Sequence, residues 1–200
     1  MTIFHLVRHA EYDLLGHELV GRRPGVHLNE KGRGQAARLA AIFSATALDG
    51  VVSSPQERAR ETADPIAARR ERPVTVTAAL DEIDFGEWTG RSFRELNNDP
   101  RWHRFNHVRG IAMVPGGELL LEAQARALRL MDELRQRVPQ GRFVLVSHGD
   151  IIRGVLTQLA GQPLDFIRRI EVGPAAVSTI LLDEGEPQIL AVNVKYDGQV

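Results

Sequence analysis

The sequence predicts an α/β fold, a three-layer sandwich in which a mostly parallel central sheet is flanked by helices. The first observation is that short apolar, β-branched runs alternate with segments of helical periodicity, as in parallel strands joined by helices. The second is that two of these runs end in a histidine, His9 and His148, at the point where strand gives way to loop. Because ligands of open α/β sheets bind beyond the carboxyl ends of the strands, we expect both histidines at one binding edge.

Length and composition favour one ordinary globular domain. The 200 residues can bury a substantial core, and no repeat, low-complexity tract or linker divides them, so we expect a single domain over residues 1–200. A net charge of −1 gives no reason to expect nucleic acid or an anionic membrane as partner. The absence of cysteine excludes disulfides, a thiolate nucleophile and cysteine-ligated metal centres. With no leader-like or membrane-spanning segment, a soluble cytoplasmic protein is expected.

The first elements follow from local patterns. Residues 3–7 form an apolar run and predict a buried strand. Residues 10–27 lack a period and contain three glycines and a proline, so they predict a loop. A helix is expected from Glu30, because apolar residues recur on one face after it. Short strands are expected at residues 51–52 and 74–77.

The helix after residues 51–52 has several start signals. Ser54 is expected to be the N-cap, Pro55 suits the first helical position, and Glu57 would close a capping box with Ser54. Arg58 then falls in the first turn, beside backbone N–H groups without helical partners. That position favours an anion.

The second half of the chain completes the alternation of helices and strands. Polar, aromatic and Pro/Gly-punctuated residues predict a short lid, with some helix, over residues 91–117. The remaining elements are a helix at 118–138, an interior strand at 143–147 followed by a helix opening at Gly149 or Asp150, and strands at 177–182 and 189–194.

The candidate site residues together suit the transfer of a phosphoryl group. His9 can act as a nucleophile at neutral pH once a hydrogen bond orients its other ring nitrogen. Arg8 and Arg58 can hold phosphate oxygens through charge-assisted bonds, and His148 can donate to the same oxygens. Glu82, next to apolar residues, is the candidate acid for the leaving alkoxide, since burial near phosphate raises a carboxyl pKa.

Several of these residues have structural alternatives. Glu82 lies in an acidic turn, and Asp84 is the alternative proton donor. Arg60 is better placed than Arg58 for an ordinary contact along the helix. The remaining histidines match no ligand spacing, and the pair His103 and His107 lacks the glutamate of a zinc motif. We therefore expect no metal site.

Five ordered motifs resemble the histidine phosphatase superfamily, the phosphoglycerate mutase-like clan. They are Arg8-His9-Ala10-Glu11, Ser53-Ser54-Pro55 with Arg58-Ala59-Arg60-Glu61-Thr62-Ala63, Glu82 with Phe85-Gly86-Glu87-Trp88, Pro115-Gly116-Gly117-Glu118, and Ser147-His148-Gly149. The resemblance implies a phosphohistidine intermediate on His9, with Arg8, Arg58 and His148 completing the phosphate pocket. It also implies Glu82 as proton donor, with no metal and no cofactor.

The first motif departs from the usual pattern of this family. Ala10 replaces a glycine, Tyr12 a threonine, and Leu15 an asparagine that follows the histidine by six residues. One donor of the phosphate pocket is therefore expected to be lost or to be supplied by Arg22 or His17. The change affects the expected substrate and efficiency more than the expected reaction.

The sequence thus predicts a metal-independent phosphatase acting on a phosphomonoester of a small metabolite. One alternative is a cofactor-dependent phosphoglycerate mutase, although mutases of this family carry a longer insertion than residues 91–117 and keep the asparagine that is Leu15 here. A second alternative is a non-catalytic phosphate-binding module. A homodimer stays open as well, because exposed edge strands can pair.

Overall fold

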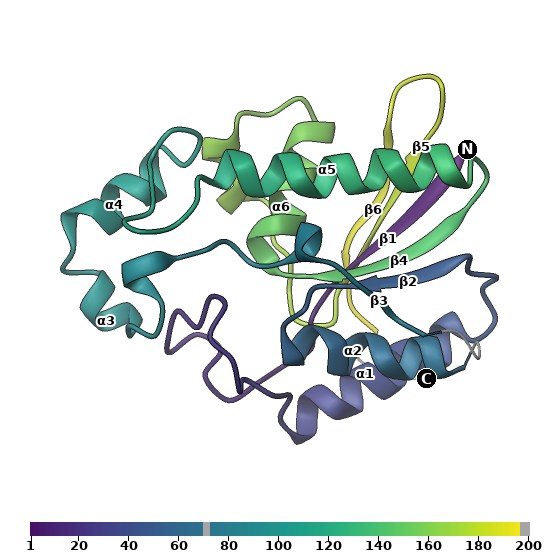
Figure 1. Ribbon diagram of the computed structural model, residues 1–200, viewed down its shortest axis with the longest axis horizontal. Helices are drawn as coiled ribbons and strands as arrows, with labels where there is room; N and C mark the ends of the chain where they lie inside the picture. Colours follow the sequence, from purple (N-terminus) through teal and green to yellow (C-terminus); the bar gives the residue numbers. More distant parts are fainter. Residues whose placement is uncertain (70–72, 197–200) are drawn as a thin grey trace.

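The computed structural model describes residues 1–69 and 73–196, in which six strands form one sheet (Figure 1). The strands are β1 (Thr2–Arg8), β2 (Gly50–Ser53), β3 (Thr75–Val76), β4 (Arg142–Ser147), β5 (Val177–Leu182) and β6 (Gln188–Val194). The α-helices are α1 (Glu30–Phe43), α2 (Glu57–Ala68), α3 (Phe93–Leu96), α4 (Pro100–His107), α5 (Leu120–Arg137) and α6 (Gly149–Leu159). The 3₁₀ helices are η1 (Ala78–Leu80), η2 (Gly86–Trp88) and η3 (Leu164–Arg169).

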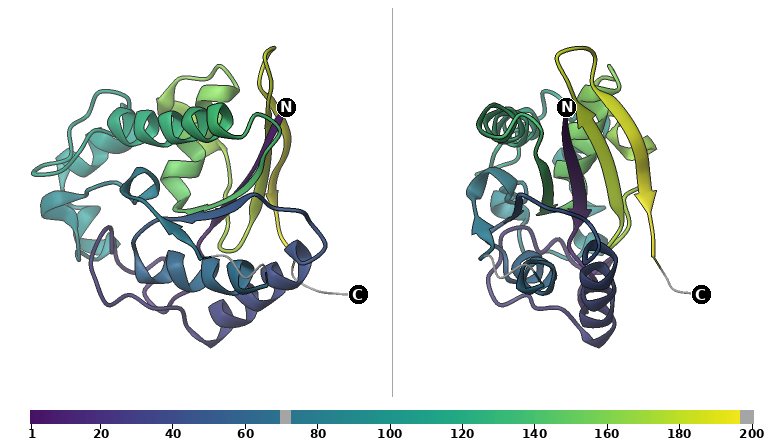
Figure 2. Two further views of the ribbon diagram at one scale, coloured as in Figure 1. Left: turned by 45° about the vertical axis from the view of Figure 1, so that its right-hand side comes forward. Right: turned by 90° about the vertical axis from the view of Figure 1, so that its right-hand side faces the viewer.

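The sheet has the order β3-β2-β4-β1-β5-β6. The neighbouring strands from β3 to β1 in this order pair in parallel. Strand β5 pairs antiparallel with both of its neighbours, β1 and β6. Figures 1 and 2 show α1 and α2 on one side of this sheet and α5 and α6 on the other. The predicted α/β sandwich with a mostly parallel sheet is therefore confirmed.

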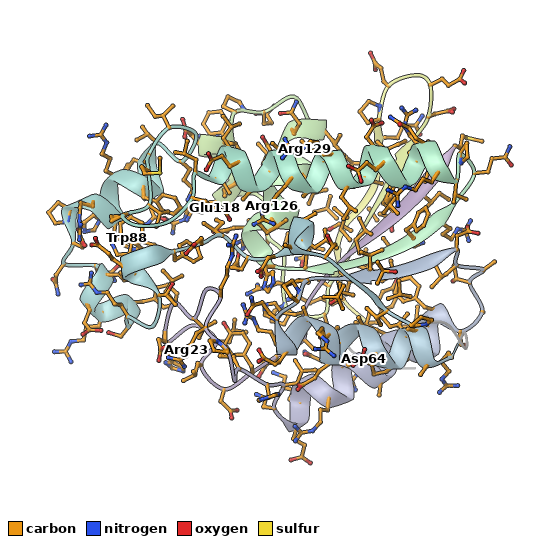
Figure 3. All side chains as sticks on the ribbon, in the orientation of Figure 1. Arg23, Asp64, Trp88, Glu118, Arg126 and Arg129 are labelled. Atoms are coloured by element: carbon orange, nitrogen blue, oxygen red, sulfur yellow. The ribbon has the colours of Figure 1, made fainter. Side chains whose placement is uncertain are left out.

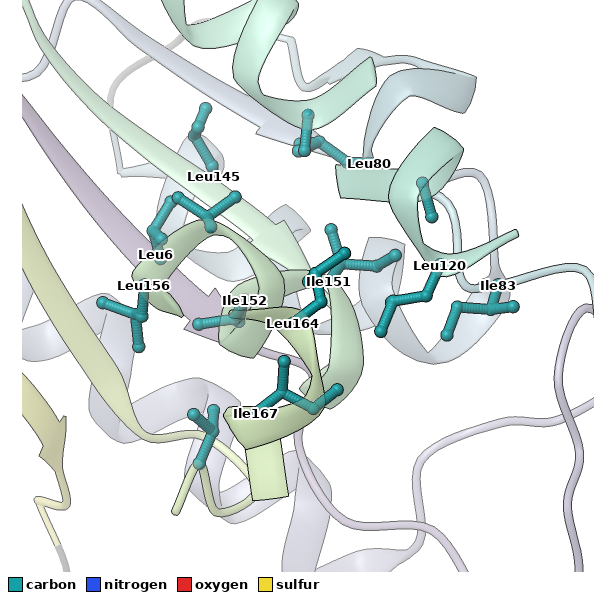
Figure 4. Packing of buried hydrophobic residues seen from close by; sticks show 14 of the residues in the cluster. Leu6, Leu80, Ile83, Leu120, Leu145, Ile151, Ile152, Leu156, Leu164 and Ile167 are labelled. Carbon is teal, nitrogen blue, oxygen red and sulfur yellow. The ribbon is translucent and has the colours of Figure 1, made fainter. Parts of the chain in front are cut away.

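Strand β4 divides the core into two halves because its side chains alternate between the two faces of the sheet. Val144 and Val146 pack with the cluster that includes α1 and α2. Phe143 and Leu145 pack with the larger cluster that includes α5 and α6. Figure 4 shows this larger cluster from close by, with Leu145 near residues of α6. Both faces of the strand are buried, which explains its continuous apolar sequence.

The predicted lid over residues 91–117 contains α3 and α4, which project to one side of the sheet (Figure 1). Its core is aromatic. The Trp88 ring lies edge-on to Trp102, with ring centroids 5.3 Å apart, and 5.5 Å from Phe105. Trp88 is fully buried, and its indole N–H donates to Asp99 at 3.2 Å. Trp88, Trp102 and Phe105 therefore serve packing.

The predicted start of α2 is wrong, because Pro55 precedes the helix and is not its first residue. Gln56, not Ser54, is the N-cap residue, and no side chain caps the helix. The Ser54 hydroxyl points to His148 and Asp81 instead, so the predicted capping box with Glu57 does not form. Arg58 still lies in the first turn, because α2 begins at Glu57.

Within residues 1–69 and 73–196, no helix is long and apolar enough to cross a membrane.

Helix α1 supports the loop that follows β1. Asn29 caps the helix by accepting from the backbone N–H of Gly32 at 2.8 Å. The N–H of Asn29 donates to the Glu11 carbonyl at 3.2 Å. A Cβ at Gly32 would overlap that same carbonyl oxygen, whereas a Cβ at Gly34 would meet nothing within 4 Å. Gly32 therefore permits a close approach between helix and loop, two residues from His9.

Two alanine substitutions in this helix should have opposite effects. Gly32→Ala is expected to lower the free energy of unfolding by about 1–3 kcal/mol, because the Glu11 backbone must move. Gly34→Ala should raise it by about 0.5–1 kcal/mol, because alanine favours the helix and has room. Urea unfolding of both variants measures the difference. Equal effects would show that the approach at Gly32 is not tight.

Candidate active site

The pairing of β1 with β4 brings the two histidines together. In this parallel pair Val7 is opposite Val146 and Arg8 is opposite Ser147, so both strands end at the same edge. The backbone N–H of His9 continues the ladder by donating to the Ser147 carbonyl at 2.9 Å. The rings of His9 and His148 then lie with their centroids 5.2 Å apart. Residues far apart in the chain thus share one site.

His9 is buried and held in one tautomer. Its Nδ1 lies 2.8 Å from the carbonyl oxygen of Ala10. Because a carbonyl only accepts, Nδ1 carries the proton and Nε2 keeps its lone pair. Burial first, and then the charges of Arg58 and Arg8, hold the His9 pKa well below its usual value. The ring is therefore neutral at physiological pH, as a nucleophile must be.

Two arginines beside His9 have donors without partners. Arg58 is only 1% exposed; its Nη2 donates to the Gly21 carbonyl at 2.7 Å and lies 3.2 Å from His148 Nδ1. Its Nε and Nη1 are buried and have no hydrogen-bond partner among the described residues. Arg8 donates from Nη1 to the Val172 carbonyl at 2.7 Å, and its Nε is likewise buried without a partner. Buried donors of this kind favour an anion.

His148 is held from behind by a chain of hydrogen bonds. Its Nε2 lies 2.7 Å from Ser54 Oγ, which in turn lies 3.2 Å from Asp81 Oδ1. All partners are satisfied when Nε2 donates to Ser54, Ser54 donates to Asp81, and Nδ1 accepts from Arg58. Burial, followed by the Arg58 charge, lowers the His148 pKa well below its usual value.

Glu82 has the environment of a proton donor. Its Oε2 lies 3.8 Å from His148 Nδ1. Burial, reinforced by the nearby negative charge of Asp150, raises the Glu82 pKa to about 7, although Arg58 and Arg8 act in the opposite direction. Asp84, the alternative acid, is 45% exposed and accepts from the Gly86 N–H, outside the cavity lining. The structure therefore favours Glu82.

Arg8, His9, Arg58 and Glu82 line a cavity of about 340 Å³, whereas His148 is not among its lining residues. Its lining residues are Arg8, His9, Tyr12, Leu15, Gly16, Glu18, Leu19, Val20, Gly21, Arg58, Glu82, Phe85, Phe93, Gly149, Asp150 and Arg153. They come from the end of β1, the starts of α2 and α6, the loop over residues 10–27, the Glu82 loop and the lid. The cavity combines two buried arginines, a neutral imidazole and a carboxyl of raised pKa.

The sequence matches the family model of the histidine phosphatase superfamily (branch 1) over residues 4–195. This chain belongs to that superfamily. A phosphoserine phosphatase 1 of Hydrogenobacter thermophilus is 32% identical over 197 residues, covering 94% of this chain and 90% of that relative. A probable phosphoglycerate mutase GpmB of Salmonella choleraesuis is 28% identical over 194 residues, covering 96% of this chain and 89% of that relative.

Solved structures agree with this assignment. YhfR of Bacillus stearothermophilus has a TM-score of 0.88 at 26% identity, with 96% of each chain covered. A phosphoserine phosphatase mutant from Entamoeba histolytica, in complex with phosphoserine, has a TM-score of 0.84 at 27% identity, covering 96% of this chain and 97% of that one.

For a histidine phosphatase, this chain uses Arg22 in an unexpected way. We predicted Arg22 or His17 as a substitute phosphate donor, and neither lines the cavity. Arg22 donates from Nε to the Glu82 carbonyl at 2.8 Å and from Nη2 to Glu118 Oε1 at 2.7 Å. Leu15 does line the cavity, where it contributes apolar surface. Arg22 therefore holds the loop that carries Glu82, and the two donors that make these bonds are not available to a phosphate.

Arg126 of α5 repeats the contacts of Arg22. Its Nη2 donates to the Glu82 carbonyl at 3.0 Å and to Glu118 Oε1 at 2.9 Å. The Asp84 N–H also donates to Glu118 Oε1, at 3.0 Å. Figure 3 shows Glu118 and Arg126 together near the start of α5. One carboxylate and two guanidinium groups thus fix the backbone on both sides of the Glu82 loop.

The sequence reasoning did not identify a second ionic group, at the start of α6. Asp150 accepts from Arg109 of the lid at 2.7 Å and from Arg153 at 3.0 Å. Asp150 and Arg153 line the cavity, and Arg109 is 5% exposed. A signal existed in the sequence, because a helix that follows His148 must place its first turn at the same edge as the histidine.

The described residues contain no group of three or more histidine, aspartate or glutamate side chains that could hold a metal ion.

The raised pKa of Glu82 leads to a prediction about how the free energy of unfolding depends on pH. Between the ordinary glutamate pKa near 4.5 and the folded value of about 7, the folded state keeps a proton that the unfolded state loses. Wild-type stability should therefore fall over this interval by a few kcal/mol relative to Glu82→Gln, and the difference should level off above pH 7. Denaturant unfolding from pH 4 to 8 measures it. A difference that is independent of pH would mean that Glu82 titrates as an ordinary carboxyl.

Proposed function

We propose that this chain is a phosphatase that hydrolyses a phosphomonoester of a small metabolite through a phosphohistidine on His9. The observation that carries the proposal is the environment of His9. Its Nδ1 proton is committed to the Ala10 carbonyl, and its Nε2 lone pair belongs to a neutral ring beside Arg8 and Arg58, whose buried donors lack partners. A nucleophile next to an anion site is what phosphoryl transfer requires.

In the first step, His9 Nε2 attacks the phosphorus atom while Arg8 and Arg58 bind the non-bridging oxygens. The new P–N bond forms as the P–O ester bond breaks, and the protonated Glu82 gives its proton to the leaving alkoxide. A pKa of about 7 leaves Glu82 protonated in a useful fraction of molecules at neutral pH. The Nδ1–H bond to Ala10 stabilises the charge that develops on the ring.

In the second step, the Glu82 carboxylate accepts a proton from water as the water oxygen attacks phosphorus. The P–N bond breaks, its electron pair returns to His9 Nε2, and inorganic phosphate leaves. Glu82 is protonated again and His9 is neutral, so the enzyme is restored. His148 contributes to both steps through Arg58, because its Nδ1 accepts from Arg58 Nη2 and orients the guanidinium that binds the phosphate.

The relatives support a small phosphorylated substrate. One is named phosphoserine phosphatase, and a similar structure holds phosphoserine in a histidine phosphatase fold. The cavity of about 340 Å³ has the size of a small-metabolite site. A phosphoglycerate mutase is the second candidate, because GpmB is also a relative. The two differ in the fate of the phosphoryl group: a phosphatase gives it to water, and a mutase returns it to the substrate.

The central test is hydrolysis of p-nitrophenyl phosphate in EDTA. Wild-type protein should turn over in EDTA and form acid-labile phosphate on the chain. His9→Ala should lose both signals, because it removes the nucleophile, with a fall in kcat of about 10³-fold or more. His107→Ala, in an exposed part of α4, is the matched control.

The outcomes separate the candidate functions. Turnover retained in His9→Ala contradicts the phosphohistidine mechanism. Stable phosphorylation by a bisphosphoglycerate, with no hydrolysis, favours the mutase. Neither phosphorylation nor turnover on any ester favours a binding module.

Glu118 gives a further prediction, because it positions the acid and does not line the cavity. Glu118→Ala should lower kcat on an alkyl ester such as O-phosphoserine about 10- to 100-fold, since displacement of the Glu82 loop misplaces the proton donor. The loss on p-nitrophenyl phosphate should be smaller, because p-nitrophenolate leaves without being protonated. The exposed Glu133→Gln on α5 is the control. Equal losses on both esters, or a lower unfolding midpoint that explains them, would reduce Glu118 to a structural role.

A further inference from the structure

Arg153 is a further cationic side chain in the cavity, in addition to Arg8 and Arg58, which bind the phosphate in the proposed mechanism. It lies in the first turns of α6, which begins directly after His148. Its Nε donates to the Ile170 carbonyl at 2.9 Å, and its Nη1 donates to Asp150 Oδ1 at 3.0 Å. Two fixed partners hold the guanidinium plane in one orientation, although the side chain is 24% exposed.

The third nitrogen of this guanidinium is available to a ligand. Arg153 lines the cavity, and its Nη2 has no hydrogen-bond partner among residues 1–69 and 73–196. Because this nitrogen has no partner and is not buried, it is accessible to solvent. An arginine whose other donors are already fixed loses little conformational entropy when it binds one more acceptor.

The charges around the cavity leave one positive charge unmatched at this position. Glu18 is paired with Arg23. Asp150 is shared between Arg109 and Arg153, so two positive charges face one negative charge. The two phosphate-binding arginines match a phosphate dianion, and the proton donor is uncharged when it acts. A single additional negative charge on the substrate would complete the balance, and a carboxylate carries that charge.

Arg153 is also close to the phosphate site. The position that a Cβ would take at Gly149 lies 3.4 Å from Arg153 Nη1 and 3.4 Å from Arg8 Nε. The Arg153 charge lowers the pKa of Arg8, after the larger effect of burial, as expected for neighbouring guanidinium groups. A group bound by Arg153 must therefore be only a few bonds from the phosphate that Arg8 binds.

From these observations we infer that Arg153 Nη2 forms a carboxylate subsite, so that the substrate is a short phosphorylated carboxylic acid with its carboxylate near the ester. This inference rests on the proposed phosphatase function. It assigns selectivity to the α6 side of the cavity, where the Asp150 contact fixes the guanidinium. The apolar residues of the lining supply no group that could bind a carboxylate.

The test compares esters that differ only in the carboxylate. O-phosphoserine and O-phosphoethanolamine form one pair, and 3-phosphoglycerate and glycerol 3-phosphate form a second. Wild-type protein should prefer the acid of each pair by about 10- to 100-fold in kcat/KM, as expected for a charge-assisted hydrogen bond. Arg153→Gln should abolish the preference, with the larger loss in KM. Arg129→Gln, an exposed arginine of α5, is the matched control and should keep it.

Each result decides the proposal. If the wild-type protein does not prefer the acid of each pair, the proposal is overturned, and no variant is needed. A preference that survives in Arg153→Gln, or equal losses on both members of a pair, also overturns it, because Arg153 would then serve only the fold. If no ester at all is hydrolysed, the proposed function fails separately. Calorimetric binding of 3-phosphoglycerate and glycerol 3-phosphate to the wild-type chain then supports the subsite if the acid binds more tightly and overturns it if both bind alike.

Discussion

The parallel pairing of β1 with β4 is the constraint on which the site depends. The hydrogen bond from His9 N–H to the Ser147 carbonyl extends the ladder by one residue, so the two histidines are placed by sheet geometry and not by loop conformation. Strand β2 pairs on the other side of β4, and α2 follows β2 directly. Arg58 therefore arrives at the same edge. A change that altered this register would separate His9 from His148 and Arg58, even with every side chain retained.

The site concentrates charge on side chains that are largely buried. Arg58 is almost fully buried with two unpartnered nitrogens, a state that costs free energy in the absence of an anion. The same burial keeps His9 neutral and raises the Glu82 pKa to about 7. One physical condition, burial beside an excess of positive charge, thus accounts for a neutral imidazole, a carboxyl of raised pKa and unpartnered arginine donors in one site.

Much of this could be predicted from the sequence, because it depends on short-range patterns. Strand ends predicted His9 and His148, and a helix start predicted Arg58. The errors involve partners distant in the chain. Ser54 bonds His148, 94 residues away, and Arg22 bonds Glu118, 96 residues away. Helix-start patterns predicted Ser54 as a helix cap. The comparison with the family pattern suggested Arg22 as a phosphate donor in place of the asparagine that is Leu15 here. Tertiary contacts that no local pattern encodes determine the actual partners of Ser54 and Arg22. The same holds for the pair Asp150 and Arg109.

Asp150 shows how the acid and the cavity wall are connected. Its two oxygens hold Arg109 of the lid and Arg153 of α6, and its charge contributes to the raised pKa of Glu82. The neighbouring arginines in turn hold the Asp150 pKa at about 2 despite burial, so its negative charge persists over the physiological range. A lid movement that withdrew Arg109 would leave that charge less neutralised and would raise the Glu82 pKa further. Arg109 of the lid is therefore coupled to the Glu82 pKa through the charge of Asp150.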